Sequence, residues 1–246
     1  LMKTLDCNYT MTDYDLIKNK AKVLWSTFAP FETVTGLAAP ELVKFSGLKA
    51  DDKVLDVGCG NKPYEKLFNS DQYIGLEIDT PENRRSKKAD MFYNGMHIPA
   101  ENKYFDGVVA FQVFEHVFNP EDFLIELRRV LKQGGKLLMT IPFVWDEHEQ
   151  PHDFARYSSF GLKAILERNG FEIIEQRKSV GDIRVVFQLI NDYFYKITVT
   201  KKPLLNILFC VFLMSPFTIA GEVLARILPG NADLYLDNVI YARKGK

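Results

Sequence analysis

The stretch Val-Leu-Asp-Val-Gly-Cys-Gly-Asn-Lys-Pro, residues 54–63, decides the fold. Four residues suited to a buried strand are followed by two glycines and then by residues that can begin a helix. Glycines in such a turn let the backbone approach a ligand closely at the carboxyl end of the first strand. The stretch therefore predicts a nucleotide-type binding site at the start of an α/β domain.

The spacing within this turn narrows the kind of ligand. A dinucleotide fingerprint needs glycines at positions 58, 60 and 63, but position 63 is Pro63, which suits the first turn of a helix. An oxidoreductase that binds NAD is therefore the weaker alternative. Asp56, two residues before Gly58, favours a ligand with a positively charged amino-acid group over a pyrophosphate.

Short apolar runs alternate with helical patterns from Lys53 to about residue 180. This alternation is typical of repeated βαβ units and of a mainly parallel sheet. Strands are expected at 54–57, 72–77, 107–111, 136–141, 172–177 and 238–242, and helices at 120–131 and 158–168. The predicted fold class is α/β, with a three-layer Rossmann-like arrangement.

Helical patterns flank this core on both sides. Residues 1–50 are expected to form an N-terminal helical cap, because apolar residues recur there at helical spacing. Residues 51–180 then form the ligand-binding core, residues 181–235 a helical insertion and residues 236–246 the last core strand.

The insertion contains an apolar segment, residues 203–221, that has no charged side chain. Its length lies at the lower limit of a membrane span. Asn206 and Pro216 argue against a span, so we favour a helix packed in the core or in a homodimer interface. Contact with a membrane remains the alternative.

Several motifs in the stretch from about 53 to 170 resemble, in order and spacing, those of class I S-adenosylmethionine-dependent methyltransferases. The histidine-rich loop at 142–157, followed by Arg156-Tyr157 and Gly161-Leu162, resembles methyltransferases of bacterial polysaccharide and glycan clusters. The resemblance implies S-adenosylmethionine as cofactor and a mostly parallel methyltransferase sheet whose last strand is antiparallel.

The same resemblance assigns cofactor contacts. We expect the first motif to surround the methionine part of the cofactor and the end of the second strand to bind the ribose. An Asp-Met pair is expected at the adenine, and the segment that follows the fourth strand is expected to line the cofactor site. The residues are Asp56, Gly58, Cys59, Gly60, Glu77, Ile78, Asp90, Met91 and Gln112. One departure is Lys62, which stands where the family commonly has a third glycine; its side chain is expected to face solvent or, less favourably, to reach the cofactor carboxylate.

Three of the four histidines fall in two loops that follow predicted strands. A histidine can take a proton from an acceptor hydroxyl near neutral pH. His152 is the favoured base, oriented by Asp153 or Glu149, and His148 and His116 are the other candidates.

A metal is not expected at these loops. Related quinone O-methyltransferases hold a metal with carboxylates and a histidine, but the position of one carboxylate is Gln112 here, beside Glu115 and His116. A pair formed by His148 and His152 with a nearby glutamate is a weaker alternative.

The favoured function is transfer of a methyl group from S-adenosylmethionine to a hydroxyl of a small molecule or sugar, with O-methylation preferred to N-methylation. The alternatives are a non-catalytic regulatory protein that binds the cofactor and a membrane-associated methyltransferase with a lipid-linked acceptor. Lys and Arg number 31 against 32 Asp and Glu, so a nucleic-acid partner is not expected. Three scattered cysteines and a polar start favour a cytoplasmic protein.

Overall fold

The computed structural model describes residues 47–49, 51–68 and 70–246 of the chain. The predicted N-terminal helical cap lies almost entirely outside these residues. The chain divides into two compact units, of which one includes residues 182–230 and the other includes residues 51–181 and 231–246. Each unit is described by itself.

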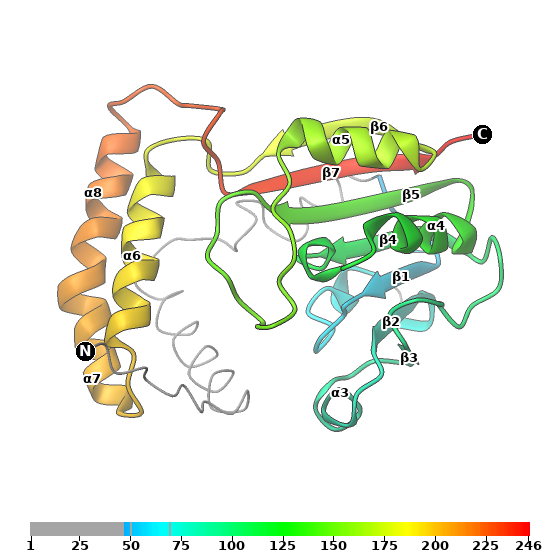
Figure 1. Ribbon diagram of the computed structural model, residues 1–246, viewed down its shortest axis with the longest axis horizontal. Coiled ribbons are helices and arrows are strands. Elements are labelled where there is room, and N and C mark those ends of the chain that lie inside the picture. The colour runs from blue at the N-terminus through cyan, green and yellow to red at the C-terminus, as the bar shows by residue number, and fades with distance from the viewer. Residues whose placement is uncertain (1–46, 50, 69) are drawn as a thin grey trace. The chain divides into compact units, whose positions relative to one another are not determined.

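The larger unit contains a seven-stranded sheet within the described residues, in the order β3-β2-β1-β4-β5-β7-β6 (Figure 1). Its strands are β1 (Val54–Val57), β2 (Tyr73–Ile78), β3 (Met91–Tyr93), β4 (Phe105–Phe111), β5 (Leu131–Pro142), β6 (Phe171–Lys178) and β7 (Asp237–Lys244). Strands β1 to β5 pair in parallel, and β7 is antiparallel to both β5 and β6. The predicted mostly parallel sheet with an antiparallel last strand is confirmed, whereas the three-residue strand β3 was not predicted.

Helices connect the strands of this unit. They are the short 3₁₀ helices η1 (Glu65–Leu67), η2 (Ser70–Gln72) and η3 (Phe114–His116), and the α-helices α3 (Pro81–Ser86), α4 (Pro120–Val130) and α5 (Ser159–Arg168). Helix α4 begins with Pro120, whose fixed φ suits the first helical turn. Helix α5 begins where the Ser158 hydroxyl accepts a hydrogen bond from the Gly161 amide. The predicted helices at 120–131 and 158–168 are thus confirmed to within a residue.

Both faces of the central strand β1 are buried, as its unbroken apolar run predicts. Leu55 and Val57 pack in a core with Leu127 of α4 and Leu162 of α5, and both helices lie on the same side of the sheet (Figure 1). Val54 faces a second core on the other side. The packing holds the ends of the parallel strands in register.

The carboxyl ends of β1, β2, β4 and β5 meet at one edge of the sheet, and loops converge there. Because β7 runs antiparallel, its first residue, Asp237, pairs with the last residue of β5, Pro142, at this same edge. Ligands of open α/β sheets bind at such an edge. The predicted site residues that follow β1, β2, β4 and β5 lie in segments that begin here.

The other unit contains a helical hairpin of α6 (Arg184–Thr198), α7 (Pro203–Phe209), the π-helical segment η4 (Cys210–Met214) and α8 (Ser215–Ala225). Helices α6 and α8 lie side by side (Figure 1). The buried Asn191 amide donates to the Thr218 hydroxyl at 3.0 Å, and Phe194 stacks on Phe217 with ring centroids 5.4 Å apart. These contacts join the two arms of the hairpin.

The helix from Pro203 to Ala225 has 23 residues, and its most apolar 18-residue window has a mean hydropathy of 2.0, but only 17% of that window is buried. Among the described residues it is a helix long and apolar enough to cross a membrane by length and composition. A helix packed in the core would be mostly buried, so this low burial does not support the core packing that was one half of the favoured interpretation of residues 203–221. The dimer and membrane alternatives are not tested by this finding.

Candidate functional site

The turn after β1 needs glycine for two reasons. Gly58 and Gly60 have φ angles of +68° and +52°, in the left-handed region that side chains disfavour. In addition, a Cβ on Gly58 would lie 2.5 Å from Val113 Cγ2 in the loop after β4. The backbone amide of Gly58 donates to the Leu76 carbonyl at 2.9 Å, which ties the turn to β2.

The carboxylate of Glu77 joins the ends of β1 and β2. Its Oε2 accepts from the Gly60 amide at 3.1 Å, and its Oε1 accepts from the Ile78 amide at 3.1 Å. Ile78 itself is 39% exposed, and its Cδ1 lies 3.6 Å from the position that a Cβ on Gly95 would take. A carboxylate and an exposed apolar side chain thus stand next to each other at the carboxyl edge.

Two residues of the predicted first motif have buried side chains. The Asp56 carboxylate accepts a hydrogen bond from the Tyr73 hydroxyl, and burial raises its pKa to about 7. Burial, aided by the nearby carboxylates, raises the pKa of the Cys59 thiol to about 12. The two buried side chains therefore pack beneath the glycine turn. A ligand at the edge would contact the backbone of the turn.

Lys62 and Asp90 form an ion pair on the face of the sheet that carries Asp56. The Lys62 side chain is 7% exposed, so the expectation that it faces solvent is wrong. A Cβ on Gly75 would lie 2.7 Å from Lys62 Cε, so this glycine makes room for the lysine. The Asp90 carboxylate also accepts from the Gly75 amide at 2.7 Å.

Asp90 directly precedes β3, and Met91 begins it. The amino end of a parallel strand lies away from the ligand edge. The residues that follow the carboxyl end of β3, and so lie at the ligand edge, are Asn94 and Gly95. The cofactor contacts predicted for Asp90 and Met91 stay a prediction that this placement does not support. The position of Asp90 relative to β3 was not evident from the sequence, because a three-residue strand leaves too short a pattern to recognise.

Gln112 follows β4 with a φ of +55°, a strained value for a residue with a side chain. Its Nε2 donates to Thr140 Oγ1 at 3.2 Å and to Asp237 Oδ1 at 3.1 Å. Burial raises the pKa of Asp237 to about 7. Sequence reasoning missed Asp237, because only the antiparallel pairing of β7 brings it to this edge.

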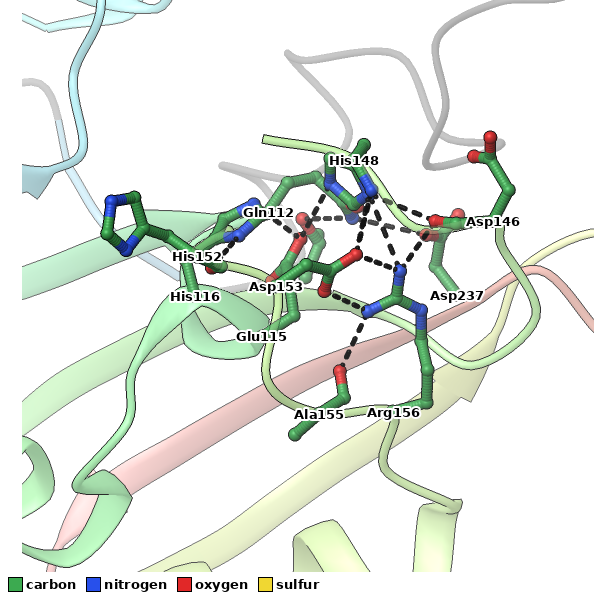
Figure 2. Close-up of polar contacts among 11 residues, drawn as sticks. Gln112, Glu115, His116, Asp146, His148, His152, Asp153, Ala155, Arg156 and Asp237 are labelled. Atoms are coloured by element: carbon green, nitrogen blue, oxygen red, sulfur yellow. Dashed lines mark hydrogen bonds and ion pairs between the residues drawn. The ribbon is translucent and has the colours of Figure 1, made fainter. Parts of the chain in front are cut away.

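Figure 2 shows residues of the loops that follow β4 and β5. A buried carboxylate, that of Glu115, lies at the centre of this group. Glu115 is fully buried, and among the described residues neither of its carboxylate oxygens has a hydrogen-bond partner. His116 Nε2 and His148 Nε2 lie 3.8 Å and 3.9 Å from Glu115 Oε1. Burial raises the pKa of Glu115 to about 8, although the positive charge of Arg156 opposes the shift.

Each of these two histidines is anchored through its other ring nitrogen. His116 Nδ1 lies 2.8 Å from the His152 carbonyl oxygen. His148 Nδ1 lies 3.3 Å from Asp153 Oδ2 and 3.2 Å from the Asp146 carbonyl oxygen. His116 Nδ1 faces a carbonyl oxygen and is assigned as protonated, which turns its Nε2 lone pair toward Glu115. His148 Nδ1 also lies 3.4 Å from the donor Arg156 Nη2, so its contacts fix the orientation of the ring and not its tautomer.

The Asp153 carboxylate lies beside the ring of His148, the other candidate base in this loop. Arg156 binds both oxygens of the Asp153 carboxylate, at 2.5 Å and 2.6 Å. Burial opposes ionisation of Asp153, but these hydrogen bonds hold its pKa at about 2. His152 is exposed at the loop surface, and its backbone amide donates to the Glu149 carbonyl at 3.0 Å (Figure 2). Orientation of the His152 ring by Asp153 or Glu149 stays a prediction, which the position of Asp153 beside His148 does not support. Which histidine acts as a base stays untested.

Comparisons with known proteins agree with this fold. The profile of a methyltransferase-domain family matches residues 31–176, more than half of the chain. The chain therefore belongs to this methyltransferase family.

Individual relatives are more distant. An uncharacterized protein of Methanocaldococcus jannaschii is 35% identical over 41% of this chain and 44% of its own length. An O-methyltransferase of Aspergillus nomiae is 25% identical over 50% of this chain and 65% of its own length. The chain thus matches less than two thirds of the length of either relative.

Among solved structures, phosphoethanolamine N-methyltransferase 2 of Haemonchus contortus, in complex with S-adenosyl-L-methionine, superposes with a TM-score of 0.59. The identity is 16%, and the superposition covers 98% of this chain and 59% of that one. At this identity the likeness shows a shared fold.

Proposed function

We propose that the protein transfers a methyl group from S-adenosylmethionine to a hydroxyl of a small molecule or sugar. The observation that carries the proposal is the hydrogen bond from the Gly60 amide to the Glu77 carboxylate. It sets a glycine turn and an acidic strand end side by side, where members of the family that this chain resembles hold the cofactor. A cytoplasmic location is part of the proposal.

In this proposal the methionine part of the cofactor lies over the backbone of Gly58 and Gly60. The Glu77 carboxylate accepts hydrogen bonds from the two ribose hydroxyls, which a carboxylate can do with both oxygens. The adenine lies against the exposed Ile78 side chain, near Asn94 and Gly95. Asn94 replaces Asp90 in this role, because it follows β3 at the ligand edge.

Methyl transfer to a hydroxyl is an in-line displacement at the sulfonium methyl. The acceptor oxygen bonds to the methyl carbon, the carbon–sulfur bond breaks, and the hydroxyl proton leaves to a base. We assign the base to His152, because its exposed ring can meet an acceptor that enters from solvent. His116 and His148 are already fixed around Glu115 and fit a positioning role better.

A histidine-rich loop beside the cofactor edge supports O-methylation, because a hydroxyl, unlike a neutral amine, must lose its proton as it reacts. The test is a screen of phenol, sugar and nucleotide-sugar acceptors with S-adenosylmethionine that carries a labelled methyl group. We expect transfer to a hydroxyl acceptor, a strong loss in His152→Ala, and wild-type transfer in His97→Ala, because His97 lies on the surface beside Glu126. Cofactor binding without transfer to any acceptor would instead support the regulatory alternative.

The exposed apolar helix Pro203–Ala225 favours a second candidate, a membrane-associated methyltransferase with a lipid-linked acceptor. Leu204, Phe212 and Ile219 on it are 77%, 74% and 63% exposed. Lys201 and Lys202 precede the helix and Arg226 follows it, so cationic side chains flank the apolar stretch, as is favourable at an anionic lipid surface.

Flotation with vesicles of phosphatidylethanolamine and phosphatidylglycerol tests this candidate. We expect the wild-type chain to float and Phe212→Asp to lose binding. Phe160→Asp is the matched control, since Phe160 is 82% exposed on α5 in the other unit. Wild-type protein that stays in solution would contradict membrane association and favour the dimer alternative, which sedimentation velocity then measures.

A further inference from the structure

The Glu115 carboxylate is buried without a partner that satisfies it. It is 0% exposed, and both of its oxygens lack a hydrogen bond within the part of the chain that the structure describes. Buried polar atoms in native proteins are nearly always bonded to protein, water or an ion, because an unsatisfied one costs about 1–3 kcal/mol and a charged one more. Such a group therefore indicates something that binds to it.

Two imidazole nitrogens face this carboxylate. His116 lies in η3, directly after β4, and His148 lies in the loop after β5, so two strand ends bring the ligands together. One ligand atom each from Glu115, His116 and His148 lie within 4.8 Å of one another. The two imidazole side chains are 21% and 19% exposed, so the cluster lies close to the protein surface although its carboxylate is buried.

Partners of the far ring nitrogens orient both imidazoles. The His152 carbonyl holds His116 Nδ1, and the Asp153 carboxylate, itself clamped by Arg156, holds His148 Nδ1. Metal-binding histidines characteristically donate their second ring N–H to a carboxylate or carbonyl, which fixes the tautomer and makes the free nitrogen more basic. Figure 2 shows the Asp153 and Arg156 side chains arranged around His148 in this way.

We propose that Glu115, His116 and His148 bind a divalent transition-metal ion of the zinc or iron type. Two nitrogens and one carboxylate oxygen are a ligand set that these ions accept, with coordination positions left for an exogenous oxygen. Ligand distances of about 2.0–2.2 Å put neighbouring ligand atoms roughly 3–3.5 Å apart. The two imidazole nitrogens lie 3.8 Å and 3.9 Å from Glu115 Oε1, and the whole set lies within 4.8 Å, so the side chains would have to move closer together when an ion binds.

The open positions suit a hydroxyl oxygen of the methyl acceptor, which the ion would position and make more acidic. This use of the ion rests on the proposed function, whereas its binding rests on the three ligands alone. Metal binding and S-adenosylhomocysteine binding, measured on the same samples, therefore test the metal site and the proposed function separately.

The experiment uses the full chain after removal of metal with a chelator. Co²⁺ serves as the probe, because bound cobalt absorbs visible light in a way that reports its nitrogen and oxygen ligands. Zn²⁺ competition and elemental analysis after dialysis give affinity and stoichiometry. We expect one bound ion per wild-type chain, at least about tenfold weaker binding in Glu115→Gln and in His148→Ala, and wild-type binding in His97→Ala.

Thermal melts by circular dichroism show which variants are folded; if Glu115→Gln is unfolded, His148→Ala decides the outcome. Failure of the folded wild-type chain to bind one ion, or equal affinity in wild type and folded His148→Ala, overturns the proposal and leaves Glu115 as a buried neutral acid. S-adenosylhomocysteine binding is measured alongside. Cofactor binding without metal binding overturns only the metal site, and metal binding without cofactor binding overturns only the proposed function.

Discussion

The Gly60 amide donates a hydrogen bond to the Glu77 carboxylate at 3.1 Å, across the ends of the neighbouring strands β1 and β2. Residues 17 positions apart in the sequence are thus fixed together at the edge where the loops converge. The same carboxylate also accepts the Ile78 amide. Its orientation is therefore set before any ligand arrives, which lowers the entropic cost of binding.

The glycine turn yields a matched pair of substitutions. Gly58→Ala introduces both an unfavourable positive φ and a Cβ 2.5 Å from Val113 Cγ2. Gly60→Ala introduces the φ cost alone, since no atom of the described residues lies within 4 Å of its Cβ. We expect losses in unfolding free energy of about 1–2 kcal/mol for Gly60→Ala and about 2–4 kcal/mol for Gly58→Ala. Urea unfolding measures both. Equal losses would show that the Val113 contact is not tight.

Asp56 predicts a pH dependence of stability. Burial raises its pKa in the folded protein to about 7, from 3.8. Between these two values the folded state holds a proton that the unfolded state has released, so this residue lowers stability as pH rises from about 4 to about 7. The difference amounts to at most about 4 kcal/mol.

Asp56→Asn is expected to remove this dependence, because the amide oxygen still accepts the Tyr73 hydroxyl without a charge to bury. Guanidinium unfolding at pH 4.5 and pH 8 measures it for both proteins. The substitution should stabilise the protein more at pH 8 than at pH 4.5. The reverse order would mean that Asp56 is ionised in the folded state.

The position of Asp90 predicts that it contributes to folding and not to cofactor binding. Asp90→Asn weakens the ion pair with the buried Lys62, and since Asp90 is 46% exposed we expect a stability loss of only about 1 kcal/mol. Affinity for S-adenosylhomocysteine should stay within about a factor of three of wild type. A large loss of affinity in a folded Asp90→Asn protein would restore the adenine contact that the sequence motif implies.

The substitution Arg156→Lys separates the effect of the positive charge at this position from the effect of the two-point contact with Asp153. Arg156→Lys keeps the positive charge but cannot bind both oxygens of Asp153 at once. We expect a stability loss of about 1–2 kcal/mol, together with a change in the NMR signals of the His148 ring, which Asp153 orients. An unchanged His148 ring signal would show that the clamp does not reach the histidine.

Local patterns in the sequence are enough to predict much of this fold. The apolar run at 54–57 and the glycines after it predict β1 and its turn, because a buried parallel strand has a distinctive composition. The helices at 120–130 and 159–168 have clear apolar faces and start signals. Strand β3 has three residues and no usable period, so the sequence does not show that Asp90 directly precedes a strand.

The candidate site depends on contacts that no local pattern contains. Gln112 and Asp237 are 125 positions apart and meet only because β7 inserts antiparallel beside β5. Glu115 and His148 are likewise joined by the sheet, and loop sequences alone do not tell which histidine faces a carboxylate. Hydropathy identifies the helix at 203–225 but not whether its apolar face is covered.

The most direct test of the central claim is a calorimetric titration of S-adenosylhomocysteine into the wild-type chain and into Glu77→Ala. Glu167→Ala, a change on the exposed face of α5, is the matched control, and NAD is the control ligand. The account predicts saturable binding of S-adenosylhomocysteine to the wild type and to the control, a loss of at least about tenfold in Glu77→Ala, and no binding of NAD. Equal binding by folded Glu77→Ala, or no binding by the folded wild type, would contradict it.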